Sequence, residues 1–412
     1  MQARTLTAIA KNIIVCRIYV RRMVSQASKR IRKEDLIRLT QVMVRIPSVN
    51  PPGNEEDLAE FLVHELKSYG FSSKLVNVKP KRPNVMAMLS GKKKGKTILM
   101  NGHMDVVPVG DLSGWKFEPF SGTLHQGRIY GRGSVDMKGG LASAIIAAKA
   151  FADTYGEDFA GRILIAGVVD EEDAGVGSKK LVESVKADMA IVAEASDDAI
   201  YRAHKGVLWF EITTKGKALH SSRVRSGNFE NAIYRMTRVV NALEDYLAEL
   251  EKRRDALVGN PTINVSIIKG GTKTNVVPDS CTITVDRRLL PKEDPKVALE
   301  EIRKLLVSKT KLKDLAFHVA LEREGTIIKE SEPIVKLTRN AVQEVTGKQP
   351  KVTGCMATTD MAFLVNQGKI PAVVYGPGSL EQAHVANEYV EVEELLKAAK
   401  VYATIFEKVL CK

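Results

Sequence analysis

The chain has few cysteines and no cysteine motif. Its 412 residues include four cysteines, which stand far apart and form no Cys-x-x-Cys pair. Nothing in this spacing indicates a disulfide framework or a thiolate metal site. A reducing compartment is the default for such a chain, and we expect a cytoplasmic protein. The four residues are Cys16, Cys281, Cys355 and Cys411.

The N-terminal part lacks both acidic residues and a long apolar run. Residues 1–33 contain nine Lys or Arg and no Asp or Glu. The apolar stretch that starts at Ile13 is broken by Arg17, which excludes a secretory signal and a membrane span. This part resembles an organelle-targeting segment, but a surface-seeking helix or an untranslated leader before Met23 would look similar. We favour a basic, disordered extension over residues 1–33 that takes no part in the chemistry.

Positive charge outside that extension is nearly balanced. The whole chain has a formal net charge of +13, yet residues 34–412 hold 53 of its 62 bases against all 49 acids. A nucleic-acid-binding face requires clustered basic residues, so we expect no nucleic-acid partner, and no membrane partner either. A chain of this length, with 44% hydrophobic residues, is long enough for two domains and a large core.

Helical and strand patterns alternate after the extension. Helices are predicted from apolar residues three or four apart, and strands from short apolar runs. The lysine-rich segment 91–95 is interpreted as a solvated hairpin turn between two strands, since it lacks the Walker pattern. Alternating elements favour a mainly parallel sheet covered on both faces. The predicted helices are 32–45, 54–69, 139–151 and 178–185, and the predicted strands are 84–89, 97–101, 162–169 and 189–192.

The pattern changes after residue 205. Two strand-helix-strand groups follow in the order β-α-β-β-α-β, which is the ferredoxin-like split motif. We therefore predict an inserted domain at 206–322 between two parts of an α/β domain, 34–205 and 323–412. The strands of the insertion are predicted at 208–213, 264–268, 281–286 and 316–321, and its helices at 228–251 and 295–307. The elements after it are helices at 334–345, 359–367 and 392–408 and a strand at 372–375.

A histidine and an aspartate follow the strand 97–101. They stand in Asn101-Gly102-His103-Met104-Asp105. In extended chain residues i and i+2 point to the same side, so Asp105 can reach the imidazole of His103. A carboxylate beside a metal-binding imidazole fixes its tautomer. A chance tripeptide in a loop is the alternative.

Four consecutive acids, Asp170–Asp173, follow the strand 162–169. The four adjacent carboxylates should repel one another unless bound cations neutralise their charge. Glu171 and Glu172 can divide two roles, one as metal ligand and the other as general base. The alternative is a solvated acidic turn.

Asp136 lies in the glycine-rich segment 131–140. A carboxylate on such a turn can bridge two cations, and two-metal sites place the ions ~3.5–4 Å apart. Two alternatives are a helix-capping aspartate and an ion pair with Arg132 or Lys138.

Glu194 and His384 complete the candidate ligands. Glu194 follows the strand 189–192, with Asp197 and Asp198 as rivals for the role. His384 ends the loop that begins at Gly376, whose backbone N–H groups could cradle a substrate oxyanion or carboxylate.

Together these motifs closely resemble the co-catalytic zinc metallopeptidase and deacylase family of acetylornithine deacetylase, succinyl-diaminopimelate desuccinylase, aminoacylase and glutamate carboxypeptidase. The resemblance runs from about Glu34 to Lys408 and includes the insertion. It implies an α/β, mainly parallel-sheet metallohydrolase catalytic domain with an inserted ferredoxin-like lid and dimerisation domain.

The resemblance also implies a set of metal ligands. His103 and Glu194 would bind one metal ion, and Glu172 and His384 the other. Asp136 would bridge the two. The cofactors implied are two divalent metal ions per subunit, zinc first and cobalt as an alternative.

Neighbouring residues receive roles by the same resemblance. Asp105 would orient His103, and Glu171 would act as the general base. The peptide bond between Asp136 and Met137 would be cis.

The inserted domain supplies a second group of residues by resemblance. His220 would reach the site of the partner subunit in a homodimer formed through the lid, and help to bind the developing oxyanion. Asn275, Arg288 and Thr358 would contact substrate, as would the loop at Gly376. Arginine suits a substrate carboxylate because it donates in a planar fork, although Arg287 is a rival to Arg288.

These expectations describe a metal-dependent amide hydrolase that removes an acyl group from a small N-acyl amino acid. The alternative within the enzyme class is a carboxypeptidase or dipeptidase acting on small peptides. Two alternatives from other classes are a non-catalytic, ligand-binding member of the fold and a nucleic-acid-binding protein that uses the basic extension.

Overall fold

The computed structural model describes residues 25–225 and 229–411, in two compact units. The larger unit comprises the chain up to Arg202, Ile328–Val352 and the chain from Phe363 onward. The inserted unit comprises Ala203–Ile327 and Thr353–Ala362. Residues 1–24 of the predicted basic extension lie outside the described residues, whereas its last part forms helix α2 (Gln26–Lys29), with Ala27 fully buried.

The inserted unit is larger than the predicted domain 206–322. It takes in Thr353–Ala362, which the sequence analysis assigned to the second part of the α/β domain. The reason is hydrogen bonding to the start of the insertion. The N–H of Lys205 donates to the carbonyl of Cys355 at 3.2 Å, and the hydroxyl of Thr358 donates to the carbonyl of Lys205 at 2.9 Å.

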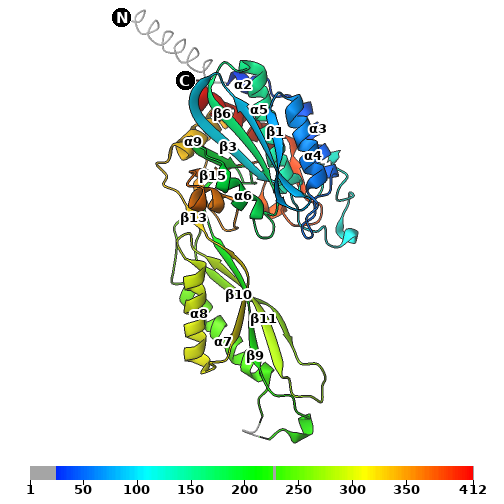
Figure 1. The fold of residues 1–412 in the computed structure, drawn as a ribbon, viewed down its shortest axis with the longest axis vertical. Coiled ribbons are helices and arrows are strands. Elements are labelled where there is room, and N and C mark those ends of the chain that lie inside the picture. The colour runs from blue at the N-terminus through cyan, green and yellow to red at the C-terminus, as the bar shows by residue number, and fades with distance from the viewer. Residues whose placement is uncertain (1–24, 226–228, 412) are drawn as a thin grey trace, which may run out of the picture. The chain divides into compact units, whose positions relative to one another are not determined.

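A mixed nine-stranded sheet contains the central strands of the larger unit, and its last strands, β13 and most of β14, belong to the inserted unit (Figure 1). The strand order is β1-β2-β6-β3-β7-β15-β8-β13, and β14 also pairs with β8. The strands are β1 (Ser72–Lys79), β2 (Arg82–Ser90), β3 (Lys93–His103), β6 (Ala160–Val168), β7 (Met189–Val192), β8 (Ile200–His204), β13 (Thr326–Ile327), β14 (Val352–Cys355) and β15 (Ala372–Val374).

The central strands β6, β3, β7 and β15 run parallel to one another. In β3 every residue from Thr97 to His103 is buried, and all four residues of β7 are buried. Because successive side chains of a strand point to opposite faces, both faces of the sheet are covered here. The prediction of a parallel α/β sheet is confirmed for this central part.

The predicted hairpin at residues 91–95 is wrong. β2 and β3 follow each other in the chain, but β6 lies between them in the sheet. β6 is antiparallel to β2 and parallel to β3. The lysine-rich segment therefore starts β3 instead of turning a hairpin. Its backbone contacts the strand start at Ala160, with Lys93 opposite that residue.

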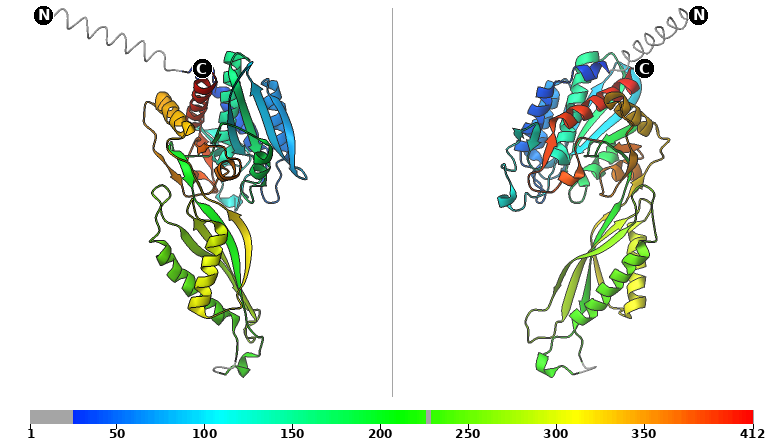
Figure 2. Two further views of the ribbon diagram at one scale, coloured as in Figure 1. Left: turned by 60° about the vertical axis from the view of Figure 1, so that its left-hand side comes forward. Right: turned by 180° about the vertical axis from the view of Figure 1, so that it is seen from behind.

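Helices of ordinary length accompany the sheet, and Figure 2 shows them from two further sides. α5 is rich in alanine and glycine and is buried over most of its length, so α10 can pack closely along it. The helices of this unit are α3 (Lys33–Arg45), α4 (Glu56–Ser68), α5 (Gly139–Tyr155), α6 (Val176–Ser184), α9 (Pro333–Thr346) and α10 (Val392–Leu410). A small sheet of β16 (Tyr389–Glu391), β5 (Arg128–Tyr130) and β4 (Thr123–His125) completes it.

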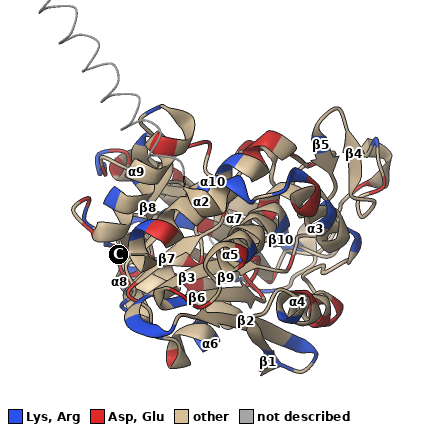
Figure 3. Cartoon of the chain, turned by 90° about the horizontal axis from the view of Figure 1, so that it is seen from above, with Lys and Arg blue, Asp and Glu red and all other residues tan. Residues whose placement is uncertain are grey.

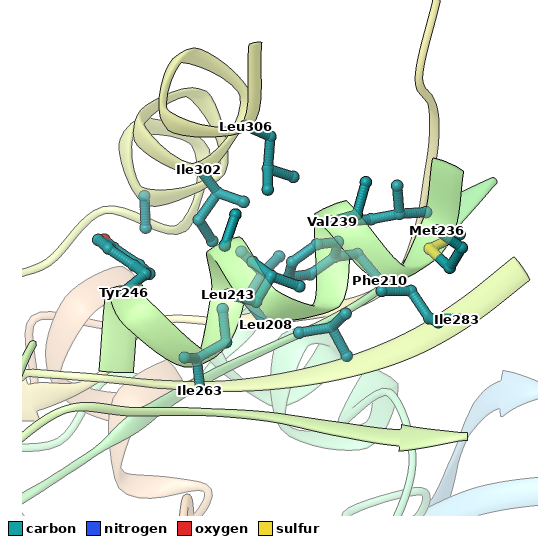
Figure 4. Close-up of a cluster of buried hydrophobic side chains, with 14 of the residues drawn as sticks. Leu208, Phe210, Met236, Val239, Leu243, Tyr246, Ile263, Ile283, Ile302 and Leu306 are labelled. Atoms are coloured by element: carbon teal, nitrogen blue, oxygen red, sulfur yellow. The ribbon is translucent and has the colours of Figure 1, made fainter. Parts of the chain in front are cut away.

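The inserted unit has the predicted β-α-β-β-α-β order. Its four strands form an antiparallel sheet in the order β10-β11-β9-β12. Buried and half-buried residues alternate along β11, and an apolar cluster lies between this sheet and the two helices (Figure 4). The elements are β9 (Gly206–Lys215), α7 (Ala232–Leu250), β10 (Thr262–Gly270), β11 (Ser280–Leu289), α8 (Pro295–Thr310) and β12 (Ala316–Arg323).

Charged residues of both signs are interspersed over the elements of the described chain (Figure 3). No helix among residues 25–225 and 229–411 is long and apolar enough to cross a membrane.

Candidate metal centre

Three of the predicted ligand positions lie at the carboxyl ends of neighbouring parallel strands. His103 is the last residue of β3, Glu172 follows β6, and Glu194 follows β7. These strands are neighbours in the order β6-β3-β7, so their ends meet at one edge of the sheet. The carboxyl edge of a parallel sheet is the usual place for a ligand site.

The other two ligands come from irregular segments. Asp136 lies in a short π-helical turn, Ser134–Lys138, where its φ and ψ of −122° and 91° are not helical. His384 lies in a loop after Leu380–Gln382, with a φ of 62°. The peptide bond between Asp136 and Met137 is cis, as the family resemblance implies.

The side chain of Asp136 lies between two imidazoles. Its Oδ1 is 3.0 Å from Nε2 of His103, and its Oδ2 is 3.2 Å from Nε2 of His384. Each imidazole also faces a glutamate. Nε2 of His103 is 3.2 Å from Oε1 of Glu194, and Nε2 of His384 is 3.1 Å from Oε2 of Glu172. The cluster is therefore two His–Glu pairs that share one aspartate.

These distances fit divalent cations between the ligand atoms. Two atoms that each lie about 2.1 Å from a tetrahedral zinc ion are about 3.4 Å apart, close to the separations of the two pairs. Ligand atoms of His103, Asp136 and Glu172 lie within 4.8 Å of one another, as do those of His103, Glu171 and Glu194. The buried Oε2 of Glu194 has no hydrogen-bond partner among the described residues, so a ligand position is open there.

Carboxylates crowd this cluster, and their pKa values show it. Burial and the nearby charge of Asp136 raise the pKa of Glu172 to about 7. Burial and Asp136 also raise the pKa of Glu194 well above its usual range. Hydrogen bonds to Asp136 and Glu172 raise the pKa of His384 to about 10. The cluster lacks positive charge, which metal ions with oxygen and imidazole ligands would supply.

Formal charges give the same result. With neutral imidazoles, the candidate ligand carboxylates of Asp136, Glu172 and Glu194 carry three negative charges, and the buried carboxylate of Glu171 adds a fourth beside them. Two divalent cations carry four positive charges. The residues present therefore fit two divalent ions in type and position, and they supply most of the negative charge that such ions require.

One imidazole is buried and the other faces solvent. His103 is fully buried, whereas the side chain of His384 is 53% exposed. The cluster therefore contacts solvent on the side of His384.

Asp105 contacts His103 chiefly through its main chain. Nδ1 of His103 donates to the carbonyl oxygen of Asp105 at 2.8 Å, while the Asp105 carboxylate lies 3.8 Å from Nδ1. This hydrogen bond directs the Nε2 lone pair of His103 toward Asp136 and Glu194. The side-chain carboxylate of Asp105 instead accepts the N–H groups of Glu171 and Glu172, at 3.0 and 3.1 Å.

The sequence analysis missed a buried ion pair that supports the Asp136 turn. Nη1 of Arg132 donates to the carboxylate of Glu388 at 2.6 Å. The other oxygen of Glu388 accepts the N–H groups of Val135 and Asp136, at 3.0 and 3.3 Å. The ion pair between Arg132 and Asp136 that the sequence left open is therefore replaced by one with Glu388, four residues after His384. The position of Glu388 close to the candidate ligand His384 is the sequence feature that could have indicated this ion pair.

Lys138, the second candidate partner of Asp136, also points elsewhere. Its Nζ donates to the carbonyl oxygens of Met43 and Ile46, at 3.0 and 2.8 Å. Burial lowers the pKa of Lys138 to about 7. The side chain thereby ties the end of α3 to the Asp136 turn.

Neither rival of Glu194 faces the cluster. Asp198 forms an ion pair with Lys397, and Asp197 accepts a hydrogen bond from the hydroxyl of Tyr201 at 3.4 Å.

The candidate substrate residues are divided between the two units. His220, Asn275, Arg288 and Thr358 belong to the inserted unit. His220 and Asn275 are exposed, and Nδ1 of His220 lies 2.7 Å from the hydroxyl of Ser222.

Arg288 and its rival Arg287 have different surroundings. Arg288 is half-buried and pairs with Asp286 at 3.0 Å, so it reaches solvent. Arg287 is fully buried and donates to Glu293. Of the two, Arg288 is the one available to a ligand.

Gly376 lies in the larger unit, directly after Tyr375. A Cβ at this position would approach the carbonyl oxygens of Ala193 and Glu194 to 2.3 and 2.5 Å. Glycine therefore lets the loop pass close to the backbone of a candidate ligand.

Comparison with known proteins decides the family. Residues 99–408 match the family described as peptidase family M20/M25/M40. The chain belongs to this family. It is accordingly a metal-dependent hydrolase, and the family predicted from the motifs is confirmed.

Curated relatives span nearly the whole chain. An N-formyl-4-amino-5-aminomethyl-2-methylpyrimidine deformylase from Halalkalibacterium halodurans is 30% identical, over 90% of this chain and 93% of that protein. A probable succinyl-diaminopimelate desuccinylase from Staphylococcus epidermidis is 28% identical, over 92% of this chain and 99% of that protein.

Solved structures share the fold. An M20 family metallo-carboxypeptidase from Sulfolobus solfataricus superposes with a TM-score of 0.75 at 23% identity, covering 90% of this chain and 98% of that one. The likeness supports the predicted architecture of an α/β domain with an inserted ferredoxin-like unit.

Proposed function

We propose that the chain hydrolyses the amide bond of a small N-acyl amino acid or related N-acyl amine, with Glu171 as the general base. The observation that carries this proposal is the shared aspartate. Asp136 presents one oxygen to His103 and the other to His384, and each imidazole faces its own glutamate.

We further propose that His103, Glu194 and Asp136 hold one divalent ion, and that Glu172, His384 and Asp136 hold a second. Zinc is the first choice for such a mixture of imidazole and carboxylate ligands, and cobalt is the alternative. When bound, the ions would polarise the substrate carbonyl and lower the pKa of water.

The protein residues then divide the proton transfers. Glu171 is buried at the same sheet edge, in a ligand group with His103 and Glu194. We propose that its carboxylate takes a proton from the attacking water and then delivers it to the departing amine as the C–N bond breaks. The hydrogen bond from its N–H to Asp105 holds it in position.

Substrate contacts are proposed for residues of both units. Gly376 exposes backbone near Glu194, and Arg288 has a guanidinium that a substrate carboxylate could engage. Asn275 and Thr358 would contribute further hydrogen bonds. His220 would donate to the developing oxyanion, in a homodimer formed through the inserted unit. The roles of these four residues of the inserted unit rest on the family resemblance.

The two curated relatives support an acyl amide as the substrate class. One is named for removing a formyl group and the other for removing a succinyl group. Both names describe release of an amine from a small acyl group, whereas a peptidase acts between amino acids. This favours the deacylase over the carboxypeptidase or dipeptidase. We also propose a cytoplasmic location and biosynthetic role.

A substrate panel tests the proposal. Zinc-loaded and cobalt-loaded protein would be assayed for amine release from N-formyl, N-acetyl and N-succinyl amino acids and from unblocked dipeptides. We expect the acylated substrates to be hydrolysed, chelation to abolish the activity, and either ion to restore it. Exclusive cleavage of dipeptides would establish the peptidase alternative. No hydrolysis of any substrate by metal-loaded protein would favour a non-catalytic, ligand-binding role.

A further inference from the structure

Asn50 lies between two buried carboxylates beside the metal centre. Its Nδ2 donates to Oδ2 of Asp105 at 2.9 Å and to Oδ1 of Asp170 at 3.2 Å. Asn50 is 3% exposed, and both carboxylates are fully buried. An amide nitrogen carries two hydrogens, so one side chain can serve both acids.

The backbone fixes Asn50 in this place. The N–H of Asn50 donates to the carbonyl of Val106 at 2.8 Å, and the N–H of Val106 donates to the carbonyl of Ser48 at 3.0 Å. Val49 forms a parallel bridge with Val106. The loop after α3 is thus attached to the chain that leaves β3, directly after Asp105.

Both partners of Asn50 hold the turn that carries Glu171 and Glu172. The carboxylate of Asp105 accepts the N–H of Glu171 at 3.0 Å with one oxygen and the N–H of Glu172 at 3.1 Å with the other. Asp170 has a φ of +70° and its carbonyl accepts the N–H of Gly175 at 2.6 Å, closing the turn.

A neutral donor is the suitable group between these acids. Asp170 already pairs with Arg82 at 2.7 Å, and Arg82 also pairs with the buried carboxylate of Glu55. A further carboxylate in place of Asn50 would add a buried negative charge to three existing ones. An apolar side chain would remove one donor from each of two buried carboxylates, so that Asp105 would keep only backbone donors and Asp170 would depend on its ion pair with Arg82.

We infer that Asn50 is a positioning residue for the general base. It orients the Asp105 carboxylate so that both oxygens receive the backbone of the catalytic turn, and it ties Asp170, the residue before Glu171, to the same point. This inference rests on the proposed role of Glu171. Small displacements of a catalytic group cost large factors in rate, so the effect should appear in kcat.

The test compares Asn50→Ala with the matched control Ser48→Ala in zinc-loaded protein. Ser48 is buried in the same loop, but its hydroxyl donates to the carbonyl of Met104 at 2.6 Å and not to the acidic turn. Hydrogen exchange at residues 169–176, bound zinc, kcat and KM would be measured for both variants, with N-acetyl, N-formyl and N-succinyl amino acids as substrates.

For Asn50→Ala we expect kcat to fall by about 10- to 100-fold, with KM within about twofold and bound zinc unchanged. Exchange at the amides of Glu171 and Glu172 should accelerate, because their acceptor is no longer held. Ser48→Ala should leave the exchange of this segment and kcat near wild type. Asn50→Ser, which keeps one hydroxyl donor, should give intermediate values, and it carries the test if Asn50→Ala does not fold.

Unchanged exchange at residues 169–176 together with wild-type kcat would overturn the inference. A fall in kcat that follows the loss of zinc, with exchange unchanged, would also overturn it, because Asn50 would then serve metal retention. Failure of the proposed function looks different. Wild-type protein would then hydrolyse no substrate, while the exchange measurement would still decide whether Asn50 holds the turn.

Discussion

The two units differ in how much charge they bury beside an apolar core. In the inserted unit, α7 and α8 pack an apolar cluster against the sheet, including Phe210, Leu243 and Ile302 (Figure 4). The larger unit has an apolar core too, but at the carboxyl edge of its sheet it also buries carboxylates, imidazoles and the cations that pair with them. Burying charge costs stability and burying apolar surface provides it. The contrast indicates that the inserted unit can lose stability without losing metal sites, while the larger unit gives up stability for chemistry.

The largest expected effect is a loss of turnover, caused by a substitution among the buried charged residues at the sheet edge of the larger unit. Glu171→Gln should lower kcat by about 10²- to 10⁴-fold, because the amide cannot accept the proton of the attacking water. Bound zinc, measured by mass spectrometry, should remain near the wild-type ratio. The matched control is Asp173→Asn, which removes the same charge from an exposed residue of the same turn. Equal turnover for Glu171→Gln and wild type would show that another group is the base.

The next effect belongs to the apolar centre and should leave the metal centre intact. Phe210 is fully buried and stacks against Phe317, with ring centroids 6.2 Å apart. Phe210→Ala should destabilise the inserted unit by about 3–5 kcal/mol through lost contacts and the cavity left behind. Urea unfolding followed by circular dichroism measures this, and zinc stoichiometry in native buffer is the second readout. The exposed Tyr234→Ala is the control. Loss of zinc binding in Phe210→Ala would break the contrast between the units.

Residues that lie at the ends of regular strands could be predicted from the sequence, because the apolar pattern of each strand shows where it ends. Each apolar run that became β3, β6 or β7 is followed by polar residues, and parallel strands deliver their ends to one edge. This is why the sequence could predict that His103, Glu172 and Glu194 follow buried strands and meet at one sheet edge. The inserted unit was found for a similar reason, because its alternating strands and amphipathic α7 have clear periods.

Features that depend on contacts between distant segments could not be predicted. The hydrogen bond from Asn50 to Asp170 joins residues 120 positions apart, and the pair of Arg132 and Glu388 joins residues 256 apart. No local sequence pattern predicts hydrogen bonds or ion pairs between residues so far apart. The predicted hairpin at residues 91–95 was wrong for the same reason. β6 lies between β2 and β3 in the sheet, but it begins about 60 residues after β3 in the chain.

The third prediction concerns a buried ionisable group of the inserted unit that lies outside its apolar cluster. His204 is fully buried, and burial lowers its pKa from the usual 6.5 to about 4. Between these values the unfolded chain binds a proton that the folded chain does not. Stability should therefore be complete above pH 6.5 and fall as the pH drops toward 4, by up to about 3 kcal/mol.

His204→Asn should remove that slope, because asparagine can still donate to the carbonyl of Lys205 but cannot be protonated. In the native protein Nδ1 of His204 lies 2.8 Å from this carbonyl, and the asparagine amide can replace that hydrogen bond. The free energy of unfolding would be measured in chelator between pH 7 and pH 4 for both proteins, so that metal release contributes to neither. Parallel profiles would mean that His204 is not protonated on unfolding in this range.

The smallest expected effect concerns the start of α7. It distinguishes the contribution of helix capping to stability from that of packing in the apolar cluster. The sequence predicted a helix that starts at residue 228, whereas α7 begins at Ala232 and Asn231 caps it. Its side-chain oxygen accepts the N–H groups of Ile233 and Tyr234, at 2.9 and 3.2 Å. Asn231→Ala should cost about 1 kcal/mol, and Asn231→Asp should recover most of it because aspartate caps equally well. Urea midpoints would measure both. If alanine cost as much as Phe210→Ala, the helix start would belong to the cooperative core of the inserted unit, and the apolar cluster alone would not account for that unit's stability.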